Sequence, residues 1–274
     1  MKMAEILAGE AVAEAISKRL KMKTDALKEQ GVVPTLAIIR LGENPGDMAY
    51  ERGATARCET VGAEVKSIVL PTDCSQEKLI SVIDEVNADN SIHGCLLLRP
   101  LPPEIDERAV CERLKHRKDV DCITIPSLGA VFTESGVGYP PCTAEACVEI
   151  LEHYGIELEG KLCVVIGRSL VIGRPVSLML QAENATVIMC HSKTEDLREL
   201  CKKADVIVSA VGHAGFLDES FLGEDQVIVD VGINRDASGK LCGDVCFDAV
   251  SQRVKAITPV PGGIGRVTSS ILKK

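Results

Sequence analysis

The sequence lacks three features that would each point to a class of function. It has no excess of basic residues, because 31 Lys and Arg stand against 40 Asp and Glu and the net charge is −9 at pH 7. A face that binds a phosphate backbone needs the opposite balance, so nucleic acid is not an expected partner. No hydrophobic run approaches the length of a membrane span, and the first twenty residues do not follow a signal-peptide pattern. We therefore expect a cytoplasmic protein that does not bind a membrane.

The twelve cysteines also lack a metal-binding or redox pattern. No two have CxxC or zinc-finger spacing, and the nearest pairs, Cys142 with Cys147 and Cys242 with Cys246, have no cluster of His or Cys beside them. The five histidines form no ligand pattern either. This usage predicts free, mostly buried thiols in a reducing compartment, and no metal.

Short apolar runs that alternate with helical patterns are present instead. After a first helical pattern at 8–30, apolar runs at 34–42, 63–71 and 94–102 alternate with helical patterns at 47–61, 75–88 and 104–114. A second series follows a helix at 143–154, with strands expected at 161–167, 185–190, 204–212 and 226–232. This alternation predicts the α/β class, with parallel sheets in two α/β domains. The Gly-rich segment 127–141, which we expect to be a loop, marks the boundary.

A candidate nucleotide site opens the second series. The stretch "VVIGRSLVIGRP" places Gly167, Arg168, Ser169 and Gly173 between a strand and a helix. Such a loop presents backbone N–H groups and a helix N-terminus to a phosphate. The spacing is G-x-S-x-x-x-G and not the standard G-x-G-x-x-G, so a purely structural glycine turn remains an alternative.

The strand that follows favours NADP over NAD. An NAD site usually has an acidic residue about 20 residues further on, but "MCHSKT" contains none before Glu195. Arg168, Ser192 and Lys193 are instead available for a 2′-phosphate. The alternative is that Ser192 caps a helix and Lys193 is only solvated. Gly212 and the pair Gly232–Ile233 end two later strands, where glycine either lets a cofactor approach closely or simply makes a turn.

The motifs together resemble one enzyme family. The stretches "HGCLLLRPLP", "RKDVDCI", "GRSLVIGRP" and "PVPGGIG" run in the order of the bifunctional methylenetetrahydrofolate dehydrogenase/methenyltetrahydrofolate cyclohydrolase family, over nearly the whole chain. The resemblance implies a homodimer of two α/β domains with a cleft between them, the second a Rossmann-like NAD(P)-binding domain. It implies a substrate and catalytic domain at 1–139 with the returning segment 259–274, and a cofactor domain at 140–258.

The resemblance also assigns residues to the substrate site. Tyr50 matches the substrate-stacking tyrosine of the motif Y-x-x-x-K, and Asp121 matches the pterin-binding aspartate, so both are expected to be catalytic. The lysine of that motif is replaced by Ala54, and a strand glutamine is replaced by Leu98, neither of which can move a proton. The remaining expected substrate-binding residues are Pro261, Gly262, Gly263 and Arg266, the last in place of a proline.

Each of these residues also has a purely structural interpretation. Without the family, Tyr50 would be a half-buried aromatic, Asp121 a capping carboxylate and Arg266 a solvated side chain. Arg57 shares the helix face of Tyr50, but a guanidinium stays protonated and is a poor base. Arg99 is expected to alternate away from Leu98 on the strand.

The expected function is NADP-dependent oxidation of 5,10-methylenetetrahydrofolate, with the cyclohydrolase step weak or lost. The alternative is a non-catalytic or repurposed paralogue that binds a nucleotide and a different anionic ligand near Arg266.

Overall fold

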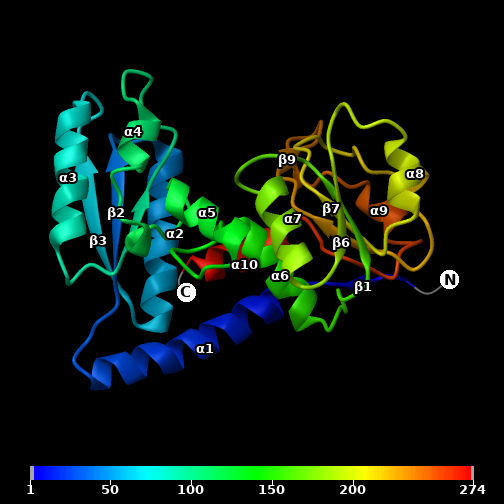
Figure 1. Cartoon of the computed structure of the whole chain (residues 1–274), viewed down its shortest axis with the longest axis horizontal. Coiled ribbons are helices and arrows are strands. Elements are labelled where there is room, and N and C mark those ends of the chain that lie inside the picture. The colour runs from blue at the N-terminus through cyan, green and yellow to red at the C-terminus, as the bar shows by residue number, and fades with distance from the viewer. Residues whose placement is uncertain (1–2, 273–274) are drawn as a thin grey trace. The chain divides into compact units, whose positions relative to one another are not determined.

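The structure is a computed structural model that describes residues 3–272 (Figure 1). Its residue contacts divide the chain into two compact units. Unit 1 comprises residues 3–14 and 143–271, and unit 2 comprises residues 15–142 and residue 272. Among the described residues, no helix is both long and apolar enough to cross a membrane. All twelve cysteines are free thiols, and nine of them are buried.

Unit 2 is built on a three-stranded parallel sheet in the order β3-β2-β4. The strands are β2 (Thr35–Leu41), β3 (Glu64–Leu70) and β4 (Gly94–Leu97). The helices are α1 (Gly9–Glu29, whose first residues belong to unit 1), α2 (Pro45–Val61), α3 (Gln76–Ala88), α4 (Glu107–Cys111), the 3₁₀ turn η1 (His116–Lys118) and α5 (Ile125–Thr133). Figure 1 shows α2 and α3 on opposite sides of this sheet.

Alternation along β2 decides which helix each side chain meets. Ala37 and Ile39 point to the face where Leu79, Ile83 and Val86 of α3 form one buried cluster with them. Helix α2 has clear end signals: Pro45 is at its first position, the Asn44 side chain accepts the N–H of Gly46 at 2.8 Å, and Gly62 ends it in the left-handed region with φ 81°.

Unit 1 is built on a six-stranded parallel sheet in the order β1-β11-β8-β7-β5-β6. These strands are β1 (Glu5–Ile6), β5 (Leu162–Ile166), β6 (Thr186–Cys190), β7 (Val206–Ser209), β8 (Val227–Asp230) and β11 (Ala256–Ile257). A small antiparallel ribbon joins β9 (Asn234–Arg235) and β10 (Leu241–Cys242). The helical segments are α6 (Cys142–His153), α7 (Gly173–Ala182), α8 (Leu197–Lys202), η2 (Glu219–Phe221), α9 (Phe247–Val250) and α10 (Ile264–Ile271). The two α/β units with parallel sheets confirm the expected fold class.

Two segments differ from the sequence expectation. The loop expected at 127–141 contains helix α5, which starts at the Thr124 N-cap with Pro126 in its first turn. The strand expected at 94–102 ends at Leu97, because Pro100, Pro102 and Pro103 cannot donate to a sheet. The alternation argument for Arg99 therefore fails, since Arg99 lies beyond the strand.

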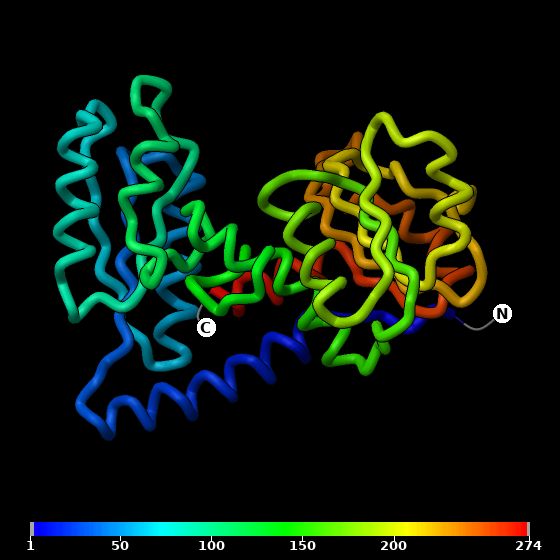
Figure 2. The backbone as a smooth tube through the Cα atoms, viewed as in Figure 1, coloured from blue at the N-terminus to red at the C-terminus, as the bar shows by residue number. Residues whose placement is uncertain are grey.

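The N-terminal strand β1 of unit 1 pairs in parallel with β11, which lies late in the chain (Figure 2). Gly9 N donates to the Gly262 carbonyl at 2.8 Å, and a Cβ at Gly9 would overlap the Gly263 carbonyl. By contacts, the segment 259–271 thus belongs with 143–258, whereas the expected domain bounds placed it with 1–139. That the segment 259–274 contributes to the substrate site remains a prediction.

Candidate functional site

The loop between β5 and α7 is closed by two glycines that no other residue can replace without a clash. Gly167 has φ 140°, and a Cβ there would lie 2.6 Å from the Ala210 carbonyl oxygen at the end of β7. A Cβ at Gly173 would overlap the Gly167 carbonyl. The backbone of this loop therefore lies close against the neighbouring strand end and against the first turn of α7.

This loop has the features of a phosphate cradle. The Ser169 hydroxyl accepts the N–H of Ile172 at 3.1 Å, which shapes the turn into α7. Ile172 precedes α7 and supplies no side-chain cap, but Ser169 already accepts the N–H groups of Gly173 at 3.5 Å and Arg174 at 3.0 Å. The next residue, Pro175, has no N–H, so the donors for a phosphate belong to the loop before α7. Arg168 is exposed in the same loop. The residues present thus fit the diphosphate of a dinucleotide.

The end of β6 brings a second set of predicted residues beside the loop. Ile166 of β5 is paired with Cys190 of β6, and Gly167 N donates to the Cys190 carbonyl at 2.9 Å. Arg168 is two residues past Ile166, and Ser192 is two residues past Cys190. The two residues therefore follow the paired ends of neighbouring strands. Helix α8 begins only at Leu197, so the alternative in which Ser192 caps a helix is wrong.

Two buried acids hold the loops that follow β7 and β8, and sequence reasoning missed both. Asp244, which is fully buried, accepts N–H groups from Val211, Gly212 and His213 at 2.7 to 3.2 Å, and the Asn234 side chain at 2.9 Å. The loops after β7 and β8 are thus fixed to one carboxylate. The signal in the sequence was an acid in the short apolar stretch "CGDVC" beside a glycine.

The second acid, Asp230, stands at the end of β8 and is 3% exposed. It accepts the N–H of Gly232 at 2.9 Å and those of Asp244 and Val245 at 3.0 Å. Burial raises the pKa of Asp230 to about 6, against the effect of these three donors, and the charge of Asp244 adds to the rise. A Cβ at Gly232 would overlap the Asp244 carboxylate, so this predicted cofactor-binding glycine is also required by packing.

One cavity of about 210 Å³ in unit 1 joins residues from the two predicted binding sets. Gly232 and Ile233, expected near the cofactor, line it together with Pro261, Gly262, Gly263 and Arg266, expected near the substrate. Arg266 is highly exposed, and its Nε lies 3.5 Å from the Glu10 carboxylate. The Arg266 side chain therefore agrees with the alternative interpretation, in which it points into solvent.

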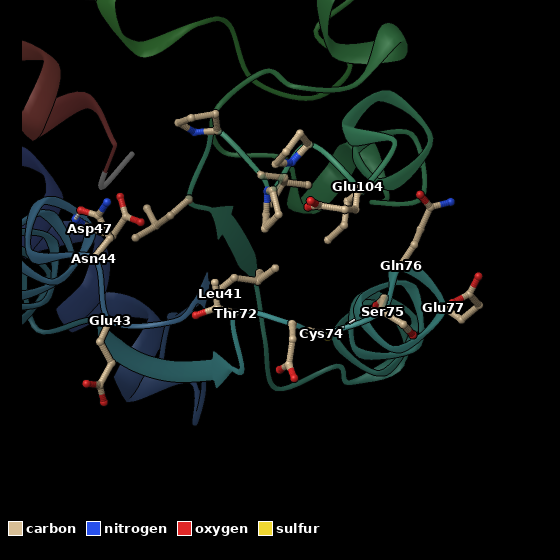
Figure 3. Close-up of a pocket in the computed structure, with 17 residues that line it drawn as sticks. Leu41, Glu43, Asn44, Asp47, Thr72, Cys74, Ser75, Gln76, Glu77 and Glu104 are labelled. Carbon is tan, nitrogen blue, oxygen red and sulfur yellow. Dashed lines mark hydrogen bonds between the residues drawn. The ribbon is translucent and has the colours of Figure 1, made fainter.

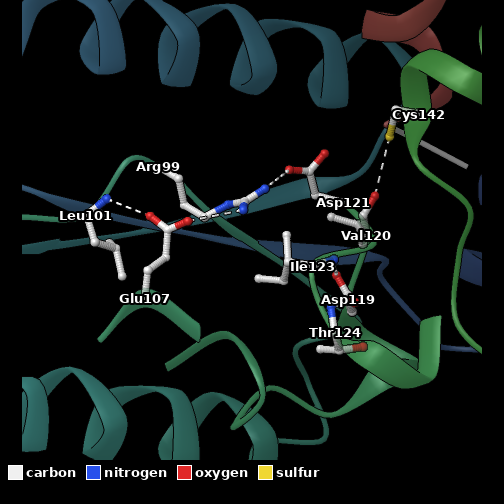
Figure 4. A network of polar contacts seen from close by, with 9 residues as sticks. All are labelled: Arg99, Leu101, Glu107, Asp119, Val120, Asp121, Ile123, Thr124 and Cys142. Atoms are coloured by element: carbon white, nitrogen blue, oxygen red, sulfur yellow. Dashed lines mark hydrogen bonds and ion pairs between the residues drawn. The ribbon is translucent and has the colours of Figure 1, made fainter. Parts of the chain in front are cut away.

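In unit 2, Tyr50 and Asp121 lie within electrostatic range of each other. Desolvation raises the pKa of Tyr50, and the charge of Asp121 raises it further. Arg99, which we had expected to point away, lies 3.6 Å from Asp121 through Nη2 and 3.4 Å from Glu107 through Nη1 (Figure 4). Desolvation also raises the pKa of Asp121, while Arg99 opposes that shift.

The neighbouring acid, Asp119, has the capping role that was the alternative for Asp121. Asp119 is fully buried and accepts the N–H groups of Ile123 at 2.9 Å and Thr124 at 2.8 Å (Figure 4). Asp121 instead forms the ion pair with Arg99. Cys122, the residue after Asp121, adopts the left-handed region with φ 55°, which is uncommon for a residue other than glycine.

The two positions where the resemblance places a lysine and a glutamine are apolar and covered. Ala54 in α2 is 1% exposed, and Leu98 after β4 is 9% exposed. Leu98 lines a hollow of about 1010 Å³ with Asp47, Cys74 and Gln76 (Figure 3), whose lining includes neither Tyr50 nor Asp121. Among residues 3–272, no group of three or more His, Cys, Asp or Glu could hold a metal ion.

Comparison with known proteins agrees with this geometry. The family model of the tetrahydrofolate dehydrogenase/cyclohydrolase catalytic domain matches residues 7–121, and that of its NAD(P)-binding domain matches residues 141–274. The bifunctional protein FolD of Carboxydothermus hydrogenoformans is 46% identical over 274 residues, which cover 99% of this chain and 96% of that protein.

Two solved structures extend the likeness to the fold. The bifunctional FolD enzyme of Campylobacter jejuni aligns with a TM-score of 0.95 and 38% identity, covering 98% of this chain and 96% of that one. The Trypanosoma brucei FolD, solved with NADP and an inhibitor, aligns with a TM-score of 0.91 and 35% identity, covering 100% and 96%. Both halves of the chain and their order are thus accounted for, and the chain belongs to the tetrahydrofolate dehydrogenase/cyclohydrolase family.

Proposed function

We propose that this protein is an NADP-dependent 5,10-methylenetetrahydrofolate dehydrogenase whose cyclohydrolase activity is weak or lost. The relatives named above are bifunctional, so the proposal departs from them in one of the two reactions. The departure rests on this chain's own residues at positions 54 and 98.

On the substrate side, Tyr50 offers a ring platform and Asp121 an acceptor for the N–H groups of a pterin. The exposed fraction of Tyr50 is 45%, so its ring is accessible to a stacking partner. The ion pair with Arg99 favours the ionised form of Asp121, which is the form that accepts hydrogen bonds. These two residues would orient the reduced pterin and so fix its methylene carbon.

On the cofactor side, the loop of Gly167, Arg168 and Ser169 would hold the diphosphate at the start of α7. Arg168 and Ser192 would meet the 2′-phosphate, and the loops at Gly212 and Gly232–Ile233 would border the rest of the dinucleotide. NADP, when bound, accepts a hydride from the methylene carbon and leaves the methenyl product. Hydride transfer depends on the relative position of two rings more than on a side-chain base.

The second reaction has different needs. Hydrolysis adds water to the methenyl carbon, breaks the bond to N5 and releases a proton, so a positioned acid or base assists it. Ala54 and Leu98 offer neither. We expect the loss of such a group to lower the hydrolysis rate by about 10²- to 10⁴-fold.

The observation that carries the proposal is this contrast: Tyr50 and Asp121 lie close enough for the Asp121 charge to raise the Tyr50 pKa, while Ala54 and Leu98 are apolar and buried. The test is to measure reduction of NADP and of NAD with 5,10-methylenetetrahydrofolate, and separately the hydrolysis of methenyltetrahydrofolate. We expect NADP reduction and hydrolysis close to the buffer rate. Hydrolysis as fast as NADP reduction would refute the loss of the second activity.

The alternative, a repurposed paralogue with a different anion near Arg266, gains no support from Arg266 itself, because Glu10 lies beside that charge. It would be favoured by NADP binding without any binding of tetrahydrofolate. A homodimer remains a prediction from the family, and sedimentation that finds a monomer at micromolar concentration would refute it. The cytoplasmic location is likewise a prediction, supported by the twelve free thiols.

A further inference from the structure

The Arg57 side chain reaches back along the surface of α2 toward Tyr50. It lies seven residues after Tyr50 and three after Ala54 on α2, and helical side chains lean toward the N-terminus of their helix. Its guanidinium accordingly lies over Gly53: a Cβ there would stand 3.1 Å from Nη1 and 3.5 Å from Nη2. The missing side chain at Gly53 and the short one at Ala54 together make room for this guanidinium.

Residue 54, where the resemblance expects a lysine, lies one turn before Arg57 on α2 and directly after Gly53. A long side chain from residue 54 leaves the helix beside Tyr50, one turn before Arg57. With alanine at 54, Arg57 brings a positive charge to the same stretch of helix from the next turn. The charge of Arg57 also acts on Tyr50, since it opposes the rise in the Tyr50 pKa that desolvation and Asp121 produce.

The guanidinium has a donor left over. Arg57 Nε is buried and has no hydrogen-bond partner among the described residues. The nearest acids on these elements are already engaged, because Glu51 is paired with Arg40 and Asp121 with Arg99. Burial closes Nε itself to a ligand, but the Arg57 side chain is only half-buried, so its terminal Nη1 and Nη2 groups are the donors that a ligand beside Tyr50 could meet.

We propose that Arg57 is a substrate-binding residue that holds a ring carbonyl oxygen of the folate-type substrate stacked on Tyr50. The proposal rests on the function proposed above and adds a residue to it. A guanidinium donates from a fixed fork and does not release a proton, so Arg57 replaces the positive charge of a lysine without its acid–base chemistry. Binding of the substrate is thereby kept while the hydrolytic step is not.

The test compares variants by substrate and cofactor separately. In Arg57→Ala, we expect the KM for methylenetetrahydrofolate and the Kd for tetrahydrofolate to rise about 10- to 100-fold, as for a lost charge-assisted hydrogen bond. The KM for NADP should stay within about twofold, since NADP would bind residues of unit 1. Arg57→Lys should recover part of the loss. Arg52→Ala, which removes an exposed arginine from the same helix, is the matched control and should change neither constant.

A second variant tests the placement of the guanidinium without removing its charge. Gly53→Ala puts a methyl group 3.1 Å from Nη1 and should raise the same KM by a smaller factor. Thermal melting separates this from loss of folding, because unfolding would weaken NADP binding as well. An unchanged substrate KM in folded Arg57→Ala would refute the role of Arg57 and leave the dehydrogenase function intact. A wild type that binds no tetrahydrofolate would refute both.

Discussion

Asp244 donates its backbone N–H to the Asp230 carboxylate over 3.0 Å, so the two buried acids are linked in series. Each carboxylate also packs against a glycine that is close in sequence to the other acid. A side chain at Gly232 would overlap the Asp244 carboxylate, and a side chain at Gly243 would overlap the Asp230 carboxylate. This arrangement ties the loops after β7 and β8 into one unit. We therefore treat the pair as the support of the proposed cofactor loops.

The first prediction concerns Asp244→Asn. The new amide group would turn a donor toward the N–H groups of Val211 and Gly212, and leave buried donors without an acceptor. We expect a loss of about 2–4 kcal/mol in the free energy of unfolding and weaker NADP binding. Urea unfolding and NADP titration measure both. Asp248→Asn, an exposed acid on α9, is the control. Unchanged NADP affinity in the folded Asp244→Asn variant would count against the supporting role.

The second prediction is a pH dependence that comes from Asp230. Its pKa of about 6 lies above the ordinary value of 3.8, chiefly because of burial, so the folded state binds this proton more tightly than the unfolded chain. The stability that Asp230 contributes is full below about pH 4 and falls by about 3 kcal/mol as the pH rises through 6. Urea unfolding from pH 4 to 7 should show a flatter profile for Asp230→Asn than for wild type. A wild-type stability that rises more steeply than the variant's over this window would contradict the assignment.

The third prediction concerns the choice of cofactor. If Arg168 and Ser192 meet the 2′-phosphate, Arg168→Ala should weaken NADP binding by about 1.5–3 kcal/mol and leave NAD binding nearly unchanged. Arg253→Ala removes the same charge from an exposed site in unit 1 and serves as control. The assignment is wrong if wild type prefers NAD, or if Arg168→Ala weakens both cofactors equally.

The fourth prediction introduces the lysine and glutamine that the resemblance places at positions 54 and 98. Ala54→Lys with Leu98→Gln should raise methenyl hydrolysis above the buffer rate, and each single change should do less, since such groups act together. At saturating methenyltetrahydrofolate, which offsets the weaker binding expected of Arg57→Ala, adding that change should increase the gain, because the Arg57 guanidinium lies over Gly53, next to residue 54. No gain in either combination, with tetrahydrofolate demonstrably bound, would mean that the pocket serves a different ligand.

The order of the main elements could be predicted from the sequence, and the reason is local. Strands such as β2 and β5 are apolar runs that end in glycine, and α2 carries a capping asparagine, an initial proline and a terminal glycine. These signals act within a few residues, so they do not depend on the rest of the fold. The Thr124–Pro126 start of α5 was a signal of the same kind, although the glycines of 127–141 led us to expect a loop.

Tertiary structure alone decided the features that depend on residues far apart in the chain. Strands β1 and β11 are two residues long and exist only because each finds a partner in the sheet. The link from Asp244 to the loop at Val211 spans 33 residues, so the stretch around Asp244 could mark a buried acid but not its partners. Arg99 meets Asp121 because β4 ends early, and Arg266 lies beside Glu10 because β1 pairs with β11 and Gly9 then contacts Gly262. The sequence thus determined the elements and the family, whereas the direction of each charged side chain was set by which distant backbone and carboxylate groups the fold brought within reach.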